Sequence, residues 1–182
     1  KIIKEYCFAP LKAGSSTLLE TPDYSLRIRS WQALCILSRF ITYDIADNVC
    51  DSIFEALNYQ LHCKIRHFLE IFAIQFGRNH PFKFGTRFVK EINRFDSSLQ
   101  QVSSLMIIGG NLIVGKYKVD FLRQIHNSGL TLHQILRGMI PWLGGTQGFS
   151  RGIAQLVVHS LIPMVIDVSL DDKSQYENEW YL

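Results

Sequence analysis

The sequence predicts an all-α protein built from stacked antiparallel helix pairs, and three observations lead to this prediction. Apolar residues recur at intervals of three and four along most of the chain. The alternation of apolar and polar residues that is typical of half-buried strands is almost absent. Only two or three residues separate the first two predicted helices, and so short a connection favours antiparallel packing.

A faint internal repeat makes the prediction more specific. Arg29, Arg66 and Arg151 each precede apolar residues at the second, fifth and sixth following positions. The first two arginines lie 37 positions apart, and 85 positions separate the second from the third. Because periods of about 40 residues in paired helices are typical of HEAT and armadillo repeats, we predict a HEAT/armadillo-like α-solenoid.

Four helices are predicted in the first half of the chain. Thr21 and Pro22 supply a cap followed by a proline at the first helical position, and the apolar face that follows extends to Ile41. The other three helices run from Asp44 to Leu61, from Lys64 to Phe76 and from Pro81 to Asn93.

Four more helices are predicted in the second half. Ser98 with Gln101, and Thr131 with Gln134, have the spacing of capping boxes, in which each side chain bonds the other's backbone amide. The predicted ranges are 96–114, 120–126, 131–140 and 149–161. Between the last two helices Pro141, Gly144, Gly145 and Gly148 predict a sharp, glycine-rich elbow.

These elements predict three parts of the chain. Residues 1–20 form an irregular lead-in or the tail of a preceding repeat, residues 21–162 form the helical-repeat domain, and residues 163–182 form an acidic linker or a truncated helix. The chain begins with Lys1 and has no signal peptide, so we expect a segment of a larger protein. No apolar run is long and uninterrupted enough for a transmembrane helix.

The cysteines favour a cytosolic protein, with a nuclear one as the alternative. Cys7, Cys35, Cys50 and Cys63 show no paired spacing, so we expect reduced thiols that pack in the interior. His62, Cys63 and His67 are close in sequence, but no second ligand cluster accompanies them, and we predict no metal site.

The charges are unevenly distributed, and this matters more than the net charge of +3. Residues 60–151 hold twelve basic and four acidic side chains, a balance of +8, whereas residues 1–59 carry −1 and residues 152–182 carry −4. A basic block of this kind suggests a polyanionic partner.

One helix concentrates this charge. Lys83, Arg87, Lys90 and Arg94 fall at i, i+4, i+7 and i+11, on a stripe separate from the apolar face. Such a stripe is either a solvated helix surface or a track for nucleic-acid phosphates. The candidate phosphate-binding residues are Lys83, Arg87, Lys90, Arg94, Lys116, Lys118, Arg123 and Arg151.

Other motifs favour structural roles. Arg151 follows the elbow, where a guanidinium either holds a phosphate or bonds neighbouring carbonyl groups. The stretch from Gly110 to Tyr117 almost matches a phosphate loop, but Tyr117 cannot replace the hydroxyl that holds magnesium, and we expect the glycines to allow close helix packing. Trp31 and Trp142 lie in apolar surroundings and are predicted core residues.

No arrangement of serine, cysteine, histidine and acidic residues marks a catalytic nucleophile, and we predict no catalytic, cofactor-binding or metal-binding residue in the chain.

Four stretches together resemble one protein family. They are IPWLGGTQGFSRGIAQLVVHSLIP (140–163), LRIRSWQALCILSRF (26–40), IRHFLEIFAIQF (65–76) and SSLMIIGGNLIVGKY (103–117). They resemble the large eukaryotic tRNA (guanosine) ribose 2′-O-methyltransferases of the TAR RNA-binding-protein type. The resemblance implies a helical-repeat region upstream of a C-terminal SPOUT methyltransferase domain, which would hold the catalytic arginine and the S-adenosylmethionine site.

The preferred hypothesis is a scaffold that grips tRNA or holds a homodimer together. The rival hypothesis is a protein-interaction solenoid, an adaptor with no role in RNA binding, since helical repeats commonly bind proteins. A third hypothesis, an autonomous enzyme, predicts turnover by the isolated chain.

Overall fold

The computed structural model describes residues 22–59, 61–94, 96–115 and 118–171, and all regular structure in these residues is helical. The predicted lead-in, 1–20, lies outside the described residues, as does the end of the chain, 172–182. The helices are α2 (Pro22–Leu37), η2 (Ser38–Phe40), α3 (Tyr43–Leu57), α4 (Cys63–Asn79), α5 (Pro81–Ile92), α6 (Leu99–Ile113), α7 (Lys118–Asn127), α8 (Leu132–Met139), η3 (Ile140–Trp142) and α9 (Gly148–Asp171).

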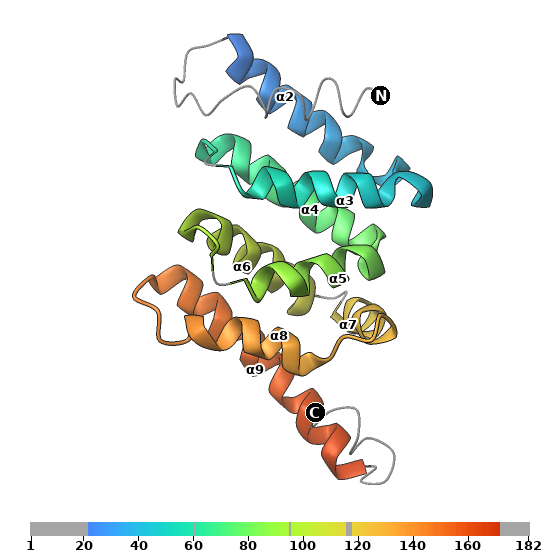
Figure 1. The fold of residues 1–182 in the computed structure, drawn as a ribbon, viewed down its shortest axis with the longest axis vertical. Helices are drawn as coiled ribbons and strands as arrows, with labels where there is room; N and C mark the ends of the chain where they lie inside the picture. Colours follow the sequence, from blue (N-terminus) through green and yellow to red (C-terminus); the bar gives the residue numbers. More distant parts are fainter. Residues whose placement is uncertain (1–21, 60, 95, 116–117, 172–182) are drawn as a thin grey trace.

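The α-helices stack in two layers along the long axis of the molecule (Figure 1). The front layer contains α3, α5 and α8, and the rear layer contains α2, α4, α6 and α9. Each front helix packs against a rear helix in the pairs α3–α4, α5–α6 and α8–α9, and helices also contact the next member of their own layer. Helix α7 departs from this order: it is seen nearly end-on and packs against α5 and α6.

Aromatic rings connect the layers through the core. Trp31 of α2 lies 5.9 Å from Phe72 between ring centroids, and Phe76, Phe84 and Phe88 continue the series at separations of 6.1–6.4 Å. All five side chains are fully buried. Rings at these distances bury large apolar areas and stabilise one another. Trp31 is therefore a core residue, as predicted, and the partly buried Trp142 packs against the same core.

The glycines of α6 serve close packing. Residues 110–113, part of the near match to a phosphate loop, belong to the helix itself. A Cβ atom at Gly109 would lie 2.7 Å from the ring of Phe88, and one at Gly110 would lie 3.0 Å from Ile153. Larger residues would push α6 away from α5 and α9, which confirms the structural interpretation of these glycines.

Each of the eight predicted helices has a counterpart among the described residues, but several predicted ends are wrong, and the ends of α3 and α9 differ most. Helix α3 stops at Leu57 rather than Leu61, because the side-chain amide of Gln100 bonds both the N–H group (3.2 Å) and the carbonyl group (2.8 Å) of Leu61. Helix α9 does not end near Leu161 but continues through Pro163 to Asp171. A proline removes one hydrogen bond, and here the helix is maintained beyond it.

The elbow lies between α8 and α9, where it was predicted. It consists of η3 and a turn in which the N–H group of Gly145 donates to the carbonyl of Trp142 at 3.3 Å. Among the described residues only Gly129 has a left-handed backbone, with φ of 79°, and it follows α7. The elbow glycines are therefore not required for a left-handed conformation.

Of the predicted caps, Ser98 accepts from the N–H of Gln101 at 3.2 Å, and Gln134 accepts from the N–H of Thr131 at 3.0 Å.

A buried ionic network joins α4 to α6 at the centre of the rear layer. Arg66 is 6% exposed, and its Nε lies 2.6 Å from Ser104 Oγ and 3.6 Å from Glu70 Oε1. The same guanidinium donates to the backbone carbonyls of Gln100 and Tyr59, and Ser104 donates to Glu70. Burial lowers the pKa of Arg66 to about 10, so the guanidinium stays charged at neutral pH. The bonds offset the cost of burying that charge.

Removal of this guanidinium should destabilise the protein strongly. We expect Arg66→Ala to lower the free energy of unfolding, measured in urea, by about 3–5 kcal/mol, because Glu70 would remain buried without its partner. The control Lys64→Ala removes an exposed cation from the same helix and should change stability by less than about 0.5 kcal/mol. The double variant Arg66→Met with Glu70→Leu should recover much of the loss. Wild-type stability in Arg66→Ala would contradict this assignment.

Candidate nucleic-acid interface

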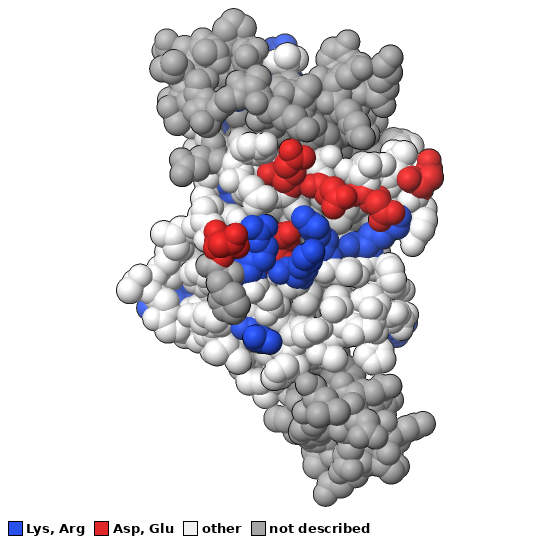
Figure 2. Space-filling model, in the orientation of Figure 1, with Lys and Arg blue, Asp and Glu red and all other residues white. Residues whose placement is uncertain are grey.

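Helix α5 presents the predicted basic stripe on the outer side of the front layer. Phe84, Phe88 and Ile92 bury one face of the helix in the core. Lys83, Arg87 and Lys90 share one face of α5, and Figure 2 shows a band of blue side chains across the middle of the molecule. These three cations therefore lie along one helix, as their spacing predicts, whereas Arg94 lies two residues beyond the end of α5 at Ile92.

A matching acidic stripe on α3 was not foreseen from the sequence. Asp44, Asp47, Asp51 and Glu55 fall at i, i+3, i+7 and i+11, and all four are exposed. Figure 2 shows acidic side chains in a row directly above the basic band. The spacing of these acids was a readable signal, but only the packing of α3 on α5 makes the two stripes neighbours.

Direct contacts link the two stripes. Lys83 Nζ lies 2.5 Å from Asp47 Oδ2, donates to the carbonyl of Tyr43 at 3.2 Å and stands 4.0 Å from the centroid of the Tyr43 ring. Arg87 Nη1 lies 3.9 Å from Asp51 Oδ1. These contacts hold α5 against α3. They also neutralise Lys83 and Arg87, two of the cations that were predicted to bind phosphates.

A second set of ion pairs centres on Glu91 of α5. Its side chain is only 2% exposed, and its two oxygens lie 3.1 Å from Arg87 Nε and 3.0 Å from Arg94 Nη1. Arg94 also binds both carboxylate oxygens of Asp96, at 3.0 and 2.9 Å. The bonds to Asp96 and Glu91 raise the pKa of Arg94, and the bonds from Arg94 lower the pKa of Asp96.

The remaining candidates have different environments. Lys90 is exposed, and within the described part of the chain it forms no ion pair. Lys118 Nζ donates to the carbonyl of Ser160 at 2.6 Å, which ties α7 to α9. Arg123 is 65% exposed and lies 3.9 Å from Asp120. Arg151 is exposed and donates to the carbonyl of Gly145 at 3.1 Å, in agreement with its structural interpretation. Lys116 lies outside the described residues.

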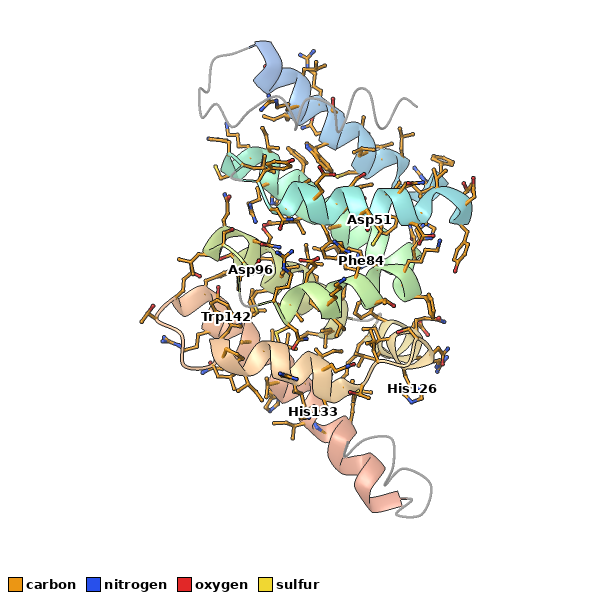
Figure 3. The ribbon with its side chains drawn as sticks, in the orientation of Figure 1. Asp51, Phe84, Asp96, His126, His133 and Trp142 are labelled. Atoms are coloured by element: carbon orange, nitrogen blue, oxygen red, sulfur yellow. The ribbon has the colours of Figure 1, made fainter. Side chains whose placement is uncertain are left out.

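Two polar side chains on α8 were not predicted as phosphate contacts from the sequence. His133 and Arg137 are exposed, lie four residues apart on one helical face, and belong to the front layer directly below α5. His133 is labelled in Figure 3 on the surface of that layer. Helix α8 contains no acidic residue, so this surface has no counterpart to the acidic stripe of α3. The absence of acids around Arg137 was the available signal.

The described residues contain no group of three or more His, Cys, Asp or Glu side chains that could hold a metal ion. Cys63 Sγ lies 3.9 Å from the ring nitrogens of His62, but His67 does not complete a ligand set with them. Burial raises the pKa of the Cys35 thiol to about 11 and that of the Cys50 thiol to about 12, so both remain protonated. In the described part of the chain no helix has the length and apolar character needed to cross a membrane.

Comparisons of the chain with protein families, with curated proteins and with solved structures found no match.

The paired cations should matter more for stability than their exposure suggests. We expect Glu91→Ala to lower the free energy of unfolding in urea by about 1–3 kcal/mol, because it leaves Arg87 and Arg94 without their shared buried acceptor. Asp51→Ala, which removes an exposed carboxylate 3.9 Å from Arg87, is the matched control and should cost less than about 0.5 kcal/mol. If Glu91→Ala and Asp51→Ala lower the free energy of unfolding equally, the buried carboxylate of Glu91 contributes no more to stability than an exposed one.

Proposed function

We propose that the chain is a non-catalytic HEAT/armadillo-like α-solenoid segment that binds RNA through its phosphate backbone. The proposal of a solenoid is supported by the stacking of helix pairs in two layers, in which most helices contact their pair partner and the next helix of their layer. Stacked pairs of this kind present long surfaces that suit elongated partners.

The distribution of acids carries the proposal of RNA binding. Residues 97–115 and 118–164 contain the cations Lys118, Arg123, Arg137 and Arg151 but a single acid, Asp120. Lys90 and Arg137 lie on neighbouring helices of the front layer, and neither forms an ion pair within the described residues. Such cations can neutralise phosphates without first breaking an ion pair, and the release of counterions makes the binding dependent on salt.

The ion pairs of α5 move the proposed contacts away from the centre of the stripe. Lys83, Arg87 and Arg94 would have to exchange protein carboxylates for phosphates, which yields little net free energy. Lys90, His133 and Arg137 therefore form the preferred phosphate-binding surface, which we call the α5–α8 surface. Arg123 and Arg151 remain secondary candidates, since each is exposed and carries at most one weak or neutral contact.

The family resemblance extends the proposal to tRNA. In that setting the chain would be the helical scaffold upstream of a SPOUT methyltransferase domain in a tRNA ribose 2′-O-methyltransferase of the cytoplasm or nucleus. S-adenosylmethionine would bind to the methyltransferase domain rather than to these helices. A homodimer held by the scaffold belongs to the same proposal. This part rests on the resemblance of the four quoted stretches alone.

One observation favours the rival function, a protein-interaction solenoid. Ile36, Leu37 and Leu156 expose 65%, 45% and 51% of their surface. Exposed aliphatic side chains are common on protein-binding surfaces when they form a patch, and Ile36 and Leu37 are adjacent at the end of α2. Binding of a protein partner at the α2 end of the helix stack is the second candidate function.

Binding of tRNA across a salt series tests the proposal. We expect filter binding of an unmodified tRNA transcript to weaken steadily as salt rises, because phosphate contacts release counterions. The double variant Lys90→Glu with Arg137→Glu should lower the slope of log K against log salt by about 2, one for each lost phosphate contact.

The control for this experiment has the same change of net charge elsewhere. Arg29→Glu with Lys64→Glu alters two exposed cations of the rear layer and should leave most of the affinity intact. No binding by the wild-type chain at low salt would refute RNA binding. Equal losses in the two double variants would show that net charge, rather than the α5–α8 surface, determines the affinity.

A further inference from the structure

A cavity of about 510 Å³ opens at the corner where α2 ends, η2 turns and α4 ends. We call this region, with the neighbouring residues Phe40 and Tyr43, the η2 corner. The polar side chains that line the cavity are Cys35, Ser38, Arg39, Gln75, Arg78 and Asn79. None of the lining residues is acidic, and two of them carry guanidinium groups. The cavity therefore favours an anionic ligand.

Hydrogen bonds fix the walls of the η2 corner. Ser38 Oγ donates to Gln75 Oε1 at 3.0 Å, and Asn79 Nδ2 donates to the carbonyl of Ser38 at 3.4 Å. The ring of His80 bonds the carbonyl of Ile41 at 3.1 Å, and burial lowers the pKa of this histidine. Since these bonds join η2 to the end of α4, the corner is organised before any ligand binds.

Two exposed aromatic rings extend the corner beyond the cavity. Phe40 is 67% exposed and Tyr43 is 65% exposed. The guanidinium carbon of Arg39 lies 5.4 Å from the centroid of the Phe40 ring, and Lys83 Nζ lies 4.0 Å from that of Tyr43. The Arg39 guanidinium therefore stands against the Phe40 ring, whereas the ammonium group against Tyr43 is already paired with Asp47, and both rings keep substantial surface open to solvent. Aromatic rings beside cations are suited to stacking with bases while the cations meet phosphates.

We propose that the η2 corner binds an unpaired segment of RNA. Bases stack on Phe40 and Tyr43, Arg39 meets a phosphate, and the cavity accepts one unstacked nucleotide. The amide groups of Gln75 and Asn79 line that space and provide polar atoms for a base edge. The inference rests on the proposed function only in that the ligand is RNA. It adds a second surface that recognises single strands.

A duplex cannot use this corner in the same way, because its bases are already stacked on one another. Single-stranded recognition depends on splayed bases and aromatic platforms, whereas duplex recognition depends on the phosphates. The α5–α8 surface therefore serves either form of RNA, and the η2 corner serves only unpaired nucleotides. Variants at the two surfaces should consequently separate the two ligands.

Fluorescence anisotropy with the full chain tests this assignment. The probes are a 5′-labelled single-stranded RNA of about ten mixed nucleotides and a duplex of the same sequence. We expect Phe40→Ala to weaken binding of the single strand by about 5- to 50-fold, through the loss of one stacked base, and to leave duplex binding within about twofold. Phe40→Trp should retain the affinity, and Phe40→Leu should lose it, since leucine keeps an apolar contact but cannot stack.

The matched control is Phe149→Ala, which removes a ring of comparable exposure (57%, against 67% for Phe40) from α9 and should change neither affinity. Circular dichroism and thermal unfolding confirm that each variant is folded. If Phe40→Ala or Phe40→Leu binds the single strand with wild-type affinity, the inference about the η2 corner is wrong. The proposed function is tested separately: it remains supported if the wild-type chain binds the duplex and Lys90→Glu with Arg137→Glu weakens that binding. If neither RNA binds and an acidic, aromatic peptide does, the corner is a protein-docking site and both proposals fail.

Discussion

A single buried cation organises the middle of this molecule. Arg66 lies within the rear layer, and its guanidinium reaches Ser104 and the carbonyl of Gln100 on the side of α6, and the carbonyl of Tyr59 after α3. A buried charge tolerates only arrangements that satisfy it, so the relative position of α4 and α6 is tightly restricted. The apolar core alone would restrict it less, because apolar side chains can pack in several registers. The neighbouring helices pack against α4 and α6, so their positions depend on the same arrangement.

Ion pairing plays a second role in the front layer, where the acidic stripe of α3 meets the basic stripe of α5. Lys83 and Arg87 contact acids of α3 there, and Arg87 and Arg94 contact Glu91 of α5. Their contribution depends on the depth of the partner: Glu91 is almost fully buried, whereas Asp47 and Asp51 are exposed. A charge pattern that favours a polyanion on an isolated helix thus stabilises helix packing in the folded protein. The cations that remain for a ligand lie at Lys90 and on α8.

The molecule therefore combines a closely packed interior with two surfaces of different character. The α5–α8 surface offers cations with few competing acids, and the η2 corner offers exposed rings, guanidinium groups and a cavity. In our proposals the first surface binds the phosphate backbone of paired or unpaired RNA, and the second binds bases that are free to stack. The two surfaces lie at different positions along the stack of helices (Figure 1). We therefore propose that one elongated RNA with paired and unpaired segments contacts both.

The sequence by itself determined the helical class and most of the helices. Local signals were sufficient where a helix depends on its own residues, as in the proline that starts α5, the Ser98 cap of α6 and the apolar face that carries Phe84 and Phe88. Tertiary structure decided the rest. Gln100 ends α3 early by bonding Leu61, and α3 supplies the carboxylates that neutralise Lys83 and Arg87. Both outcomes depend on residues about 36 to 39 positions apart, which no local pattern relates, because electrostatic and hydrogen-bond partners are chosen by proximity in space.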